Sequence, residues 1–194
     1  MSSNESDTRT KIMEATWRLM EENRAQGVRM SDIAKAAGIS RQAVYLHFAN
    51  RTDLIRATRD YIDEINGLED RLQVVWSARN GVEMMNAYVD VWGNYLPEIH
   101  GVAGALLAAS DTDEAAAAAM NDCMSAHREG CRQIIEVLHK EGRLAPEWPL
   151  PEVTELLWTM LSFQTWEQLT VDCGWSRERY NKWMKTLLAR ALIN

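Results

Sequence analysis

The sequence has few of the features that mark secreted, metal-binding or membrane proteins. Only three of its 194 residues are cysteine (Cys123, Cys131 and Cys173), and their spacing matches no zinc finger. An odd number of thiols without a disulfide framework is typical of a reducing compartment. The longest uncharged run, residues 99–110, is shorter than the roughly 18 to 20 residues that a membrane-spanning helix needs. We therefore expect a cytoplasmic protein.

The sequence also lacks the short motifs that carry much enzyme chemistry. It contains no glycine-rich phosphate loop, no serine in a nucleophile elbow and no paired histidines of a zinc hydrolase. Residues 1–8 are polar, so we expect a short mobile arm there and not an export signal. The protein is therefore not expected to be an enzyme or to bind a cofactor or metal ion.

What the sequence does contain is a helix-turn-helix pattern between residues 30 and 54. The pattern predicts a first helix over residues 31–37 and a second over residues 41–48, the latter capped by Ser40. Gly38 supplies the backbone freedom that the sharp turn between them requires. Such a unit typically reads DNA by placing its second helix in the major groove.

The second predicted helix has one side that we expect to be buried and one that we expect to face outward. Val44 and Phe48 are four residues apart and share the buried side. Gln42 lies opposite them, and glutamine can make paired hydrogen bonds to adenine in the major groove. Small or apolar side chains suit the thymine methyl group, so Ala43 and Leu46 are further candidate base readers.

Other polar side chains near this helix are suited to holding the DNA backbone. Tyr45 and His47 end in hydrogen-bonding groups on flat rings, and Arg51 lies where the next helix begins, so all three are candidates for phosphate contacts. The complete set of candidate DNA-binding residues is Arg29, Ser31, Ser40, Arg41, Gln42, Ala43, Tyr45, Leu46, His47 and Arg51.

The run MSDIAKAAGISRQAVYLHFANRTDL closely resembles the N-terminal domain of the TetR (tetracycline repressor) family of transcriptional regulators. The most specific part is residues 45–48, followed three residues later by a cation and then by Leu54. The cation is Arg51 where the family usually has lysine. The family's usual threonine cap is replaced by Arg29, so either Ser31 caps the first helix or the cap is lost.

The charge of the chain is divided unevenly. The formal net charge is −7, yet residues 24–59 contain seven cations and two carboxylates, which leaves −12 on the remainder. A basic stretch on an acidic body suits one surface that faces phosphate and another that faces solvent.

Outside the helix-turn-helix, every substantial segment reads as helical and none shows the alternation of a strand. We expect an all-α fold in which a three-helix DNA-binding domain joins a helical ligand-binding and dimerisation bundle. The predicted domains are residues 1–50 for DNA binding, 51–66 as a connecting helix, and 67–194 for effector binding and dimerisation. The other predicted helices cover residues 9–23, 82–96 (ended by Pro97), 99–109, 111 or 112 to 140, 152–173 and 176–192.

The last two predicted helices carry more apolar surface than one buried stripe requires. Leu157, Leu161, Trp183 and Leu187 are the candidates for a dimer interface, and burial within one chain is the alternative. The family resemblance implies dimerisation through these helices. Two-fold symmetry would then place two recognition helices about 34 to 36 Å apart on a pseudo-palindromic operator.

Aromatic and thioether side chains form a candidate effector site in the second domain. Ordinary core packing is the alternative for each of them. The spacing of Cys123, His127 and Cys131 also leaves metal binding or redox sensing open. The candidate ligand-binding residues are Tyr88, Trp92, Tyr95, Met124, His127 and Trp158.

Together, these features predict a ligand-responsive transcriptional regulator. We expect it to bind a double-stranded DNA operator as a homodimer and to be released by a small molecule, without a membrane partner. The family resemblance favours a repressor. The alternatives are an ungated DNA-binding protein and a small-molecule-binding helical protein or enzyme.

Overall fold

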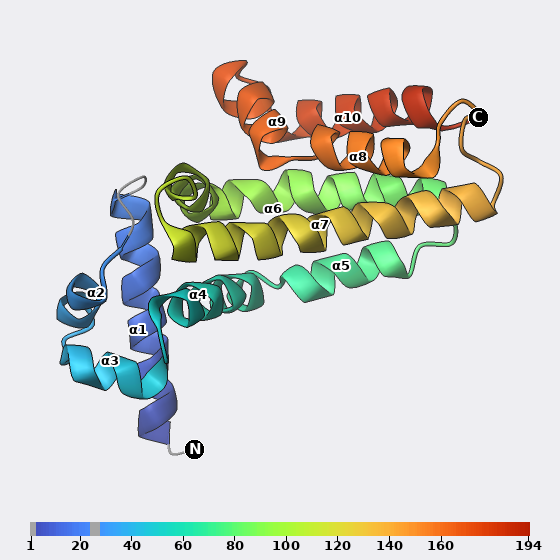
Figure 1. The fold of residues 1–194 in the computed structure, drawn as a ribbon. Helices are drawn as coiled ribbons and strands as arrows, with labels where there is room; N and C mark the ends of the chain where they lie inside the picture. The colour runs from blue at the N-terminus through green and yellow to red at the C-terminus, as the bar shows by residue number, and fades with distance from the viewer. Residues whose placement is uncertain (1–2, 24–27) are drawn as a thin grey trace. The chain divides into compact units, whose positions relative to one another are not determined.

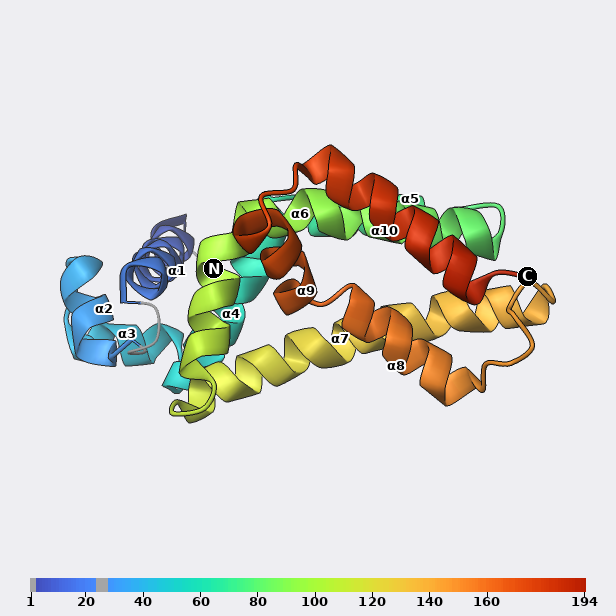
Figure 2. The same cartoon turned by 90° about the horizontal axis from the view of Figure 1, so that it is seen from above.

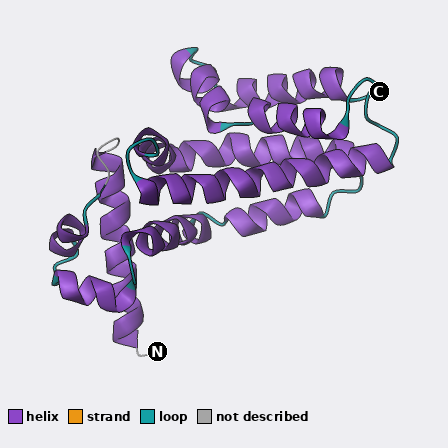
Figure 3. Ribbon diagram, viewed as in Figure 1, coloured by secondary structure: helices purple, strands orange, loops and turns teal. Residues whose placement is uncertain are grey.

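The structure, a computed structural model, describes residues 3–23 and 28–194 and consists of helices joined by loops and turns (Figure 3). Within these residues there is no strand, and one isolated antiparallel bridge joins Leu144 to Ile193. The predicted all-α fold is confirmed. The elements labelled in Figure 1, with the π-helical turn η2, are α1 (Ser3–Asn23), α2 (Met30–Ala36), α3 (Arg41–His47), α4 (Arg51–Ile65), α5 (Leu68–Trp76), α6 (Gly81–Ala109), α7 (Glu114–Lys140), α8 (Leu150–Met160), α9 (Phe163–Glu167), η2 (Gln168–Asp172) and α10 (Arg177–Leu192).

The chain forms two compact units. Unit 1 consists of residues 1–66 and 99–123, and unit 2 of residues 67–98 and 124–194. This grouping differs from the division drawn from the sequence, because α4 and residues 99–123 belong to the same unit as the helix-turn-helix. Helices α6 and α7 each contribute residues to both units.

The core of unit 1 runs from α1 to the first turns of α7. Ile12 of α1, Ile33 of α2, Val44 of α3 and Leu54 of α4 are completely buried in one hydrophobic cluster, together with Ala119. Helix α1 lies beside α2 and α3 (Figure 1). Helices as short as α2 and α3 cannot bury a core alone, so α1 and α4 complete it.

Unit 2 is a helical bundle in which α10 lies along α6 and α8 lies along α7 (Figure 2). Lys185 Nζ of α10 is 2.7 Å from Asp90 Oδ1 of α6, and Arg128 Nη2 of α7 is 2.7 Å from Glu155 Oε1 of α8. These surface ion pairs lie at the margins of a buried interior that includes Tyr88, Tyr95, Ile134, Leu138, Leu157 and Tyr180.

The middle of the chain differs from the predicted helices in two places. Pro97 was expected to end a helix, but it lies inside α6. Proline removes one intrahelical hydrogen bond, and the turns on both sides supply enough others to continue the helix. Helix α5 was missed, although Leu68, Leu72 and Val75 have the spacing of one helical face.

The predicted helix over residues 152–173 is interrupted. Helix α8 ends at Met160, and the Ser162 hydroxyl then accepts a hydrogen bond from Thr165 N (3.2 Å), which starts α9. A serine side chain that satisfies a free backbone N–H favours a new helix start over a continuous helix. The predicted start of the final helix is confirmed, since Ser176 Oγ accepts from Arg179 N (3.2 Å).

The first helix begins earlier than predicted. Residues 3–8 belong to α1 and are not a mobile arm, whereas residues 1–2 lie outside the described part of the chain. Lys11 Nζ is 2.7 Å from Asp7 Oδ2, and such an i, i+4 pair stabilises a helix. No helix within residues 3–23 and 28–194 has both the length and the apolar character needed to cross a bilayer.

Candidate nucleic-acid interface

The turn between α2 and α3 has the predicted geometry. Gly38 has φ of 70°, a left-handed conformation that a side chain would disfavour. Ser40 has an extended backbone, and its hydroxyl accepts a hydrogen bond from Ala43 N at 3.1 Å. The predicted cap at Ser40 is therefore confirmed. Asn50 caps α4 in the same way, because its Oδ1 accepts from Asp53 N at 2.9 Å.

Helix α3 separates a buried side from an exposed side. Val44 and Phe48 are buried in the core of unit 1. Leu46 is 83% exposed and Tyr45 is 42% exposed, and Gln42 is exposed with them. A large apolar side chain held in water on a short helix suggests a surface that meets a partner.

The polar residues around this face are partly ordered by one another. Arg41 Nη2 donates to the Tyr45 hydroxyl (3.3 Å), and the Arg41 guanidinium carbon lies 5.6 Å from the centre of the Tyr45 ring. This pair presents a cation and a phenol side by side. Ser40 is exposed, and Ala43 and His47 are half-buried.

Arg9 of α1 is a positioning residue that the sequence analysis missed. Its Nη1 donates to the His47 carbonyl at 2.9 Å, and its guanidinium carbon lies 4.2 Å from the centre of the Phe48 ring. A cation at the C-terminus of a helix interacts favourably with the free carbonyls there. Arg9 therefore fixes the end of α3 against α1.

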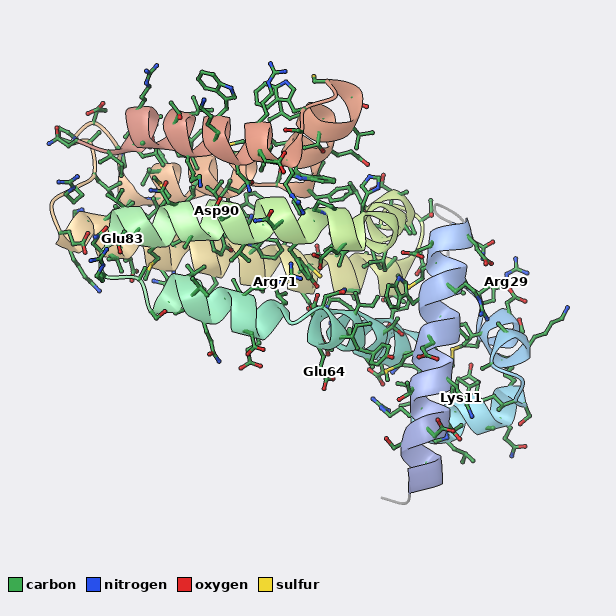
Figure 4. All side chains as sticks on the ribbon, turned by 180° about the vertical axis from the view of Figure 1, so that it is seen from behind. Lys11, Arg29, Glu64, Arg71, Glu83 and Asp90 are labelled. Atoms are coloured by element: carbon green, nitrogen blue, oxygen red, sulfur yellow. The ribbon has the colours of Figure 1, made fainter. Side chains whose placement is uncertain are left out.

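The start of α2 settles the question of its cap. Arg29 is the residue before the helix, and its side chain makes no capping hydrogen bond. Ser31 Oγ contacts Asp32 Oδ1 at 3.4 Å and is not a cap, so the cap is lost and the helix begins at Met30. Both Arg29, labelled in Figure 4, and Ser31 are exposed, as a DNA contact would require.

Arg51, a candidate phosphate contact, is paired with other residues of unit 1. Its Nη1 donates to the Val28 carbonyl at 2.9 Å and to Asp113 Oδ2 at 2.7 Å, and its Nη2 donates to Asp113 Oδ1. The guanidinium is therefore engaged inside unit 1, with 29% of the Arg51 side chain exposed.

Four of the six candidate ligand-binding residues lie together in unit 2. The Tyr88 hydroxyl is 2.8 Å from His127 Nδ1, and the Tyr88 and His127 rings are stacked at a centroid distance of 5.6 Å. Trp92 meets the His127 ring edge-on at 4.9 Å and the Tyr95 ring at 5.9 Å. Tyr88, Tyr95 and His127 are buried, so the cluster is closely packed.

The protonation state of this cluster follows from its burial. Burial lowers the pKa of His127 to about 4, although a backbone hydrogen bond at Leu161 opposes the shift. The imidazole is therefore neutral at physiological pH. Trp158 is half-buried with the guanidinium carbon of Arg128 5.8 Å from its ring centre, and Met124 is also half-buried.

The environments of Cys123 and Cys131 do not favour a redox or metal-binding role. Burial raises the pKa of Cys131 to about 12, and burial also raises the pKa of Cys123, although Arg59 Nη1 lies 3.8 Å from its sulfur. A protonated thiol is a poor nucleophile and metal ligand. Within the described ranges 3–23 and 28–194, no group of three His, Cys, Asp or Glu side chains is arranged to hold a metal ion.

The candidate dimerisation residues divide into two pairs. Leu157 and Leu161 are buried within unit 2, so they cannot contact a second copy. For this pair the alternative of burial within one chain is correct, because α8 packs its apolar side into its own bundle. Trp183 and Leu187 lie one turn apart on α10 and are 48% and 47% exposed, so they remain candidates.

An all-helical chain whose N-terminal unit exposes one face of a helix-turn-helix belongs to the class of helix-turn-helix DNA-binding proteins. Residues 12–58 match the family described as bacterial regulatory proteins, tetR family. This match covers most of α1 and all of α2 and α3 and reaches into α4, so the N-terminal part of the chain is similar to TetR-family transcriptional regulators. It is 36% identical over 58 residues to the HTH-type transcriptional regulator TtgR of Pseudomonas putida. That alignment covers 30% of this chain and 28% of TtgR.

Solved structures share the fold over nearly the whole chain. FadR from Bacillus subtilis in complex with stearoyl-CoA has a TM-score of 0.74 at 15% identity, covering 92% of this chain and 96% of that one. NalD, the secondary repressor of the MexAB-OprM multidrug efflux pump in Pseudomonas aeruginosa, has a TM-score of 0.72 at 18% identity, covering 99% and 98%. At these identities the similarity shows the fold alone.

Proposed function

We propose that the protein is a repressor that binds a pseudo-palindromic operator as a homodimer and is released by a small molecule. The observation that carries the proposal is the exposed face of α3, with Gln42, Tyr45 and Leu46 outward and Val44 and Phe48 buried beneath it. A rigid helix of this kind can enter the major groove without rearrangement.

Each exposed residue has a distinct proposed role. Gln42 makes paired hydrogen bonds to an adenine, and Leu46 with Ala43 contacts thymine methyl groups. Tyr45 and its neighbour Arg41 hold a phosphate, because a phenol and a guanidinium are both donors to phosphate oxygens. The base contacts would determine sequence preference, whereas the phosphate contacts would determine affinity for any duplex.

Dimerisation is proposed to occur through α10. Trp183 and Leu187 place two large apolar side chains on one exposed turn, and a second copy would remove this surface from water. Two recognition helices related by two-fold symmetry would then meet successive major grooves about 34 to 36 Å apart.

The effector is proposed to bind at the aromatic cluster of Tyr88, Trp92, Tyr95 and His127. The rings offer apolar faces, and the neutral imidazole and phenol offer hydrogen-bonding groups, a combination suited to a largely apolar ligand with few polar atoms. FadR, whose fold this chain shares, was solved with stearoyl-CoA, and the stearoyl chain of that ligand is apolar. Release requires that the ligand bind more tightly to a state that mismatches the operator.

A gel shift with the full chain tests this function. The wild-type protein is used to select duplexes from a randomised pool, and one selected duplex is then titrated with and without stearoyl-CoA and planar aromatic compounds. We expect a shifted complex that contains two protomers and dissociates with at least one of these compounds. A shift that none of them reverses favours an ungated DNA-binding protein, and the absence of any shift favours a small-molecule-binding protein or enzyme.

A further inference from the structure

Arg51 joins three segments of unit 1 that are far apart in the sequence. It is the first residue of α4, and it donates to the carbonyl of Val28, just before α2. The same guanidinium donates through both terminal nitrogens to Asp113, which precedes α7. The Arg51 side chain is 29% exposed and that of Asp113 is 10% exposed. A two-pronged pair with so little exposure is held in one geometry.

Asp113 has a second function, because it also caps α7. Its Oδ1 accepts hydrogen bonds from Ala115 N (3.0 Å) and Ala116 N (3.1 Å), which explains why α7 begins at Glu114 and not at residue 111 or 112. Burial would raise the pKa of Asp113, but the Arg51 hydrogen bond and the two backbone N–H groups lower it. The carboxylate is therefore ionised and fully engaged.

The position of these bonds in the chain determines what they do. Val28 lies immediately before α2, and Arg51 lies three residues after Phe48, where the chain leaves α3. One guanidinium thus ties both ends of the helix-turn-helix segment, residues 28–51, to the N-terminal cap of α7. The chain on both sides of the helix-turn-helix is thus held by one side chain, which restricts movement of this segment relative to the start of α7.

We propose that Arg51 is a positioning residue, not a phosphate contact: through Asp113 it fixes the orientation of the recognition helix within unit 1. This inference rests on the proposed function of α3 in reading DNA. The place of Arg51 in the sequence, directly after the helix-turn-helix, predicts a phosphate contact. Its side chain instead hydrogen-bonds to Val28 and Asp113 within unit 1.

The chain offers a matched control on the same two helices. Arg56 Nε of α4 is 2.6 Å from Asp122 Oδ2 of α7, and these side chains are 43% and 41% exposed. An exposed ion pair contributes little to stability. The Arg56 pair does not reach the helix-turn-helix segment, so its removal should leave α3 in place.

The test compares Arg51→Gln, Asp113→Asn and the double variant with Arg56→Gln and Asp122→Asn, using the full chain and a duplex selected by the wild-type protein. Asparagine is a good helix cap, so Asp113→Asn removes the charge and keeps the start of α7. We expect each Arg51 or Asp113 single variant to bind about tenfold more weakly, with the double variant no weaker than either. The salt dependence should not change, and the Arg56 and Asp122 variants should bind as wild type does.

A phosphate contact would give a different pattern. Arg51→Gln would lower the slope of log affinity against log salt by about 0.9, and Asp113→Asn would leave binding unchanged or strengthen it by freeing the cation. Either result would overturn the proposal.

A second measurement does not depend on DNA. Hydrogen exchange of the amides of residues 28–47 in the free protein should be faster in Arg51→Gln and Asp113→Asn than in wild type or in the Arg56 and Asp122 variants. Unchanged exchange would also overturn the role of Arg51. Failure of the wild-type protein to select any duplex would reject the proposed function, and the exchange experiment would still decide whether Arg51 holds α3.

Discussion

The polar side chains singled out in the two units differ in exposure and charge. In unit 1, Gln42 is exposed, and the mostly buried guanidinium of Arg51 is paired with a carboxylate. In unit 2, Tyr88 and His127 are buried and neutral and hydrogen-bond to each other. A partner can reach α3 without rearrangement, whereas a ligand can reach the centre of the aromatic cluster only if packed rings separate. The proposed DNA binding and the proposed ligand binding therefore place different demands on the two units.

The two phenylalanines of the chain test whether the units are stabilised separately. Phe48 lies in the core of unit 1 and Phe163 in that of unit 2, and both are buried. Each alanine substitution should cost about 3 to 5 kcal/mol of unfolding free energy, because it removes a large side chain and leaves a cavity. We expect hydrogen exchange of α2 and α3 to accelerate strongly in Phe48→Ala and little in Phe163→Ala. Equal acceleration of both units in both variants would show that they unfold together.

The buried histidine predicts a pH dependence that arises in unit 2. The pKa of His127 is lowered from about 6.5 in the unfolded chain to about 4, so the unfolded chain binds the proton more tightly. This stability is present above pH 6.5 and is lost as the pH falls toward 4, with a total loss of about 3 kcal/mol.

Urea unfolding at a series of pH values measures this loss of stability. In His127→Asn, the part of the loss that comes from protonation of His127 should be absent. His139→Asn, which replaces an exposed imidazole of the same helix, is the control. An identical pH dependence in wild type and His127→Asn would contradict the neutral, buried state of this ring.

The exposed face of α3 predicts a change of base preference when Gln42 is replaced. Loss of a paired contact to one base should reduce discrimination at that position by about 1 to 3 kcal/mol in Gln42→Ala. Duplex selection with the variant and with wild type measures this directly. Gln73→Ala, at an exposed position of α5 in unit 2, should leave the preferred sequence unchanged. Weakening by the same factor on every duplex would mean that Gln42 does not read a base.

The smallest expected effect is that of removing a helix cap, and it compares a loss of stability with a loss of DNA binding. Ser40 and Ser176 cap α3 and α10 with nearly equal hydrogen bonds of 3.1 and 3.2 Å to backbone N–H groups. Each alanine substitution should cost about 1 kcal/mol of stability. Only Ser40→Ala should also weaken binding to a selected duplex, because it loosens the start of the recognition helix. Equal loss of DNA affinity in both variants would contradict the prediction that only the cap of α3 affects DNA binding.

The parts of unit 1 that the sequence could predict depend on contacts between near neighbours. The turn at Gly38, the cap at Ser40 and the buried pair of Val44 and Phe48 all involve residues within a few positions of each other, and all are present. The role of Arg51 depends on Asp113, 62 residues away, and that of Arg9 on His47, 38 residues away. Periodicity carries no information about such pairings.

In unit 2 the same limit applies to aromatic residues. Tyr88, Trp92 and Tyr95 have the spacing of one helical face, but this spacing could not distinguish a ligand site from packed core. It also could not show that Leu157 faces inward while Trp183 faces outward. Which side of an apolar helix is covered depends on neighbouring helices that are distant in the sequence.

The most direct test of the central claim, that the exposed face of α3 enters the major groove of two symmetric half-sites, is methylation interference on a duplex selected by the wild-type protein. Methyl groups on guanine N7 lie in the major groove, and those on adenine N3 lie in the minor groove. The account predicts interference at N7 positions in two clusters related by two-fold symmetry and about one helical turn apart. Interference confined to adenine N3, or found in a single cluster, would contradict it.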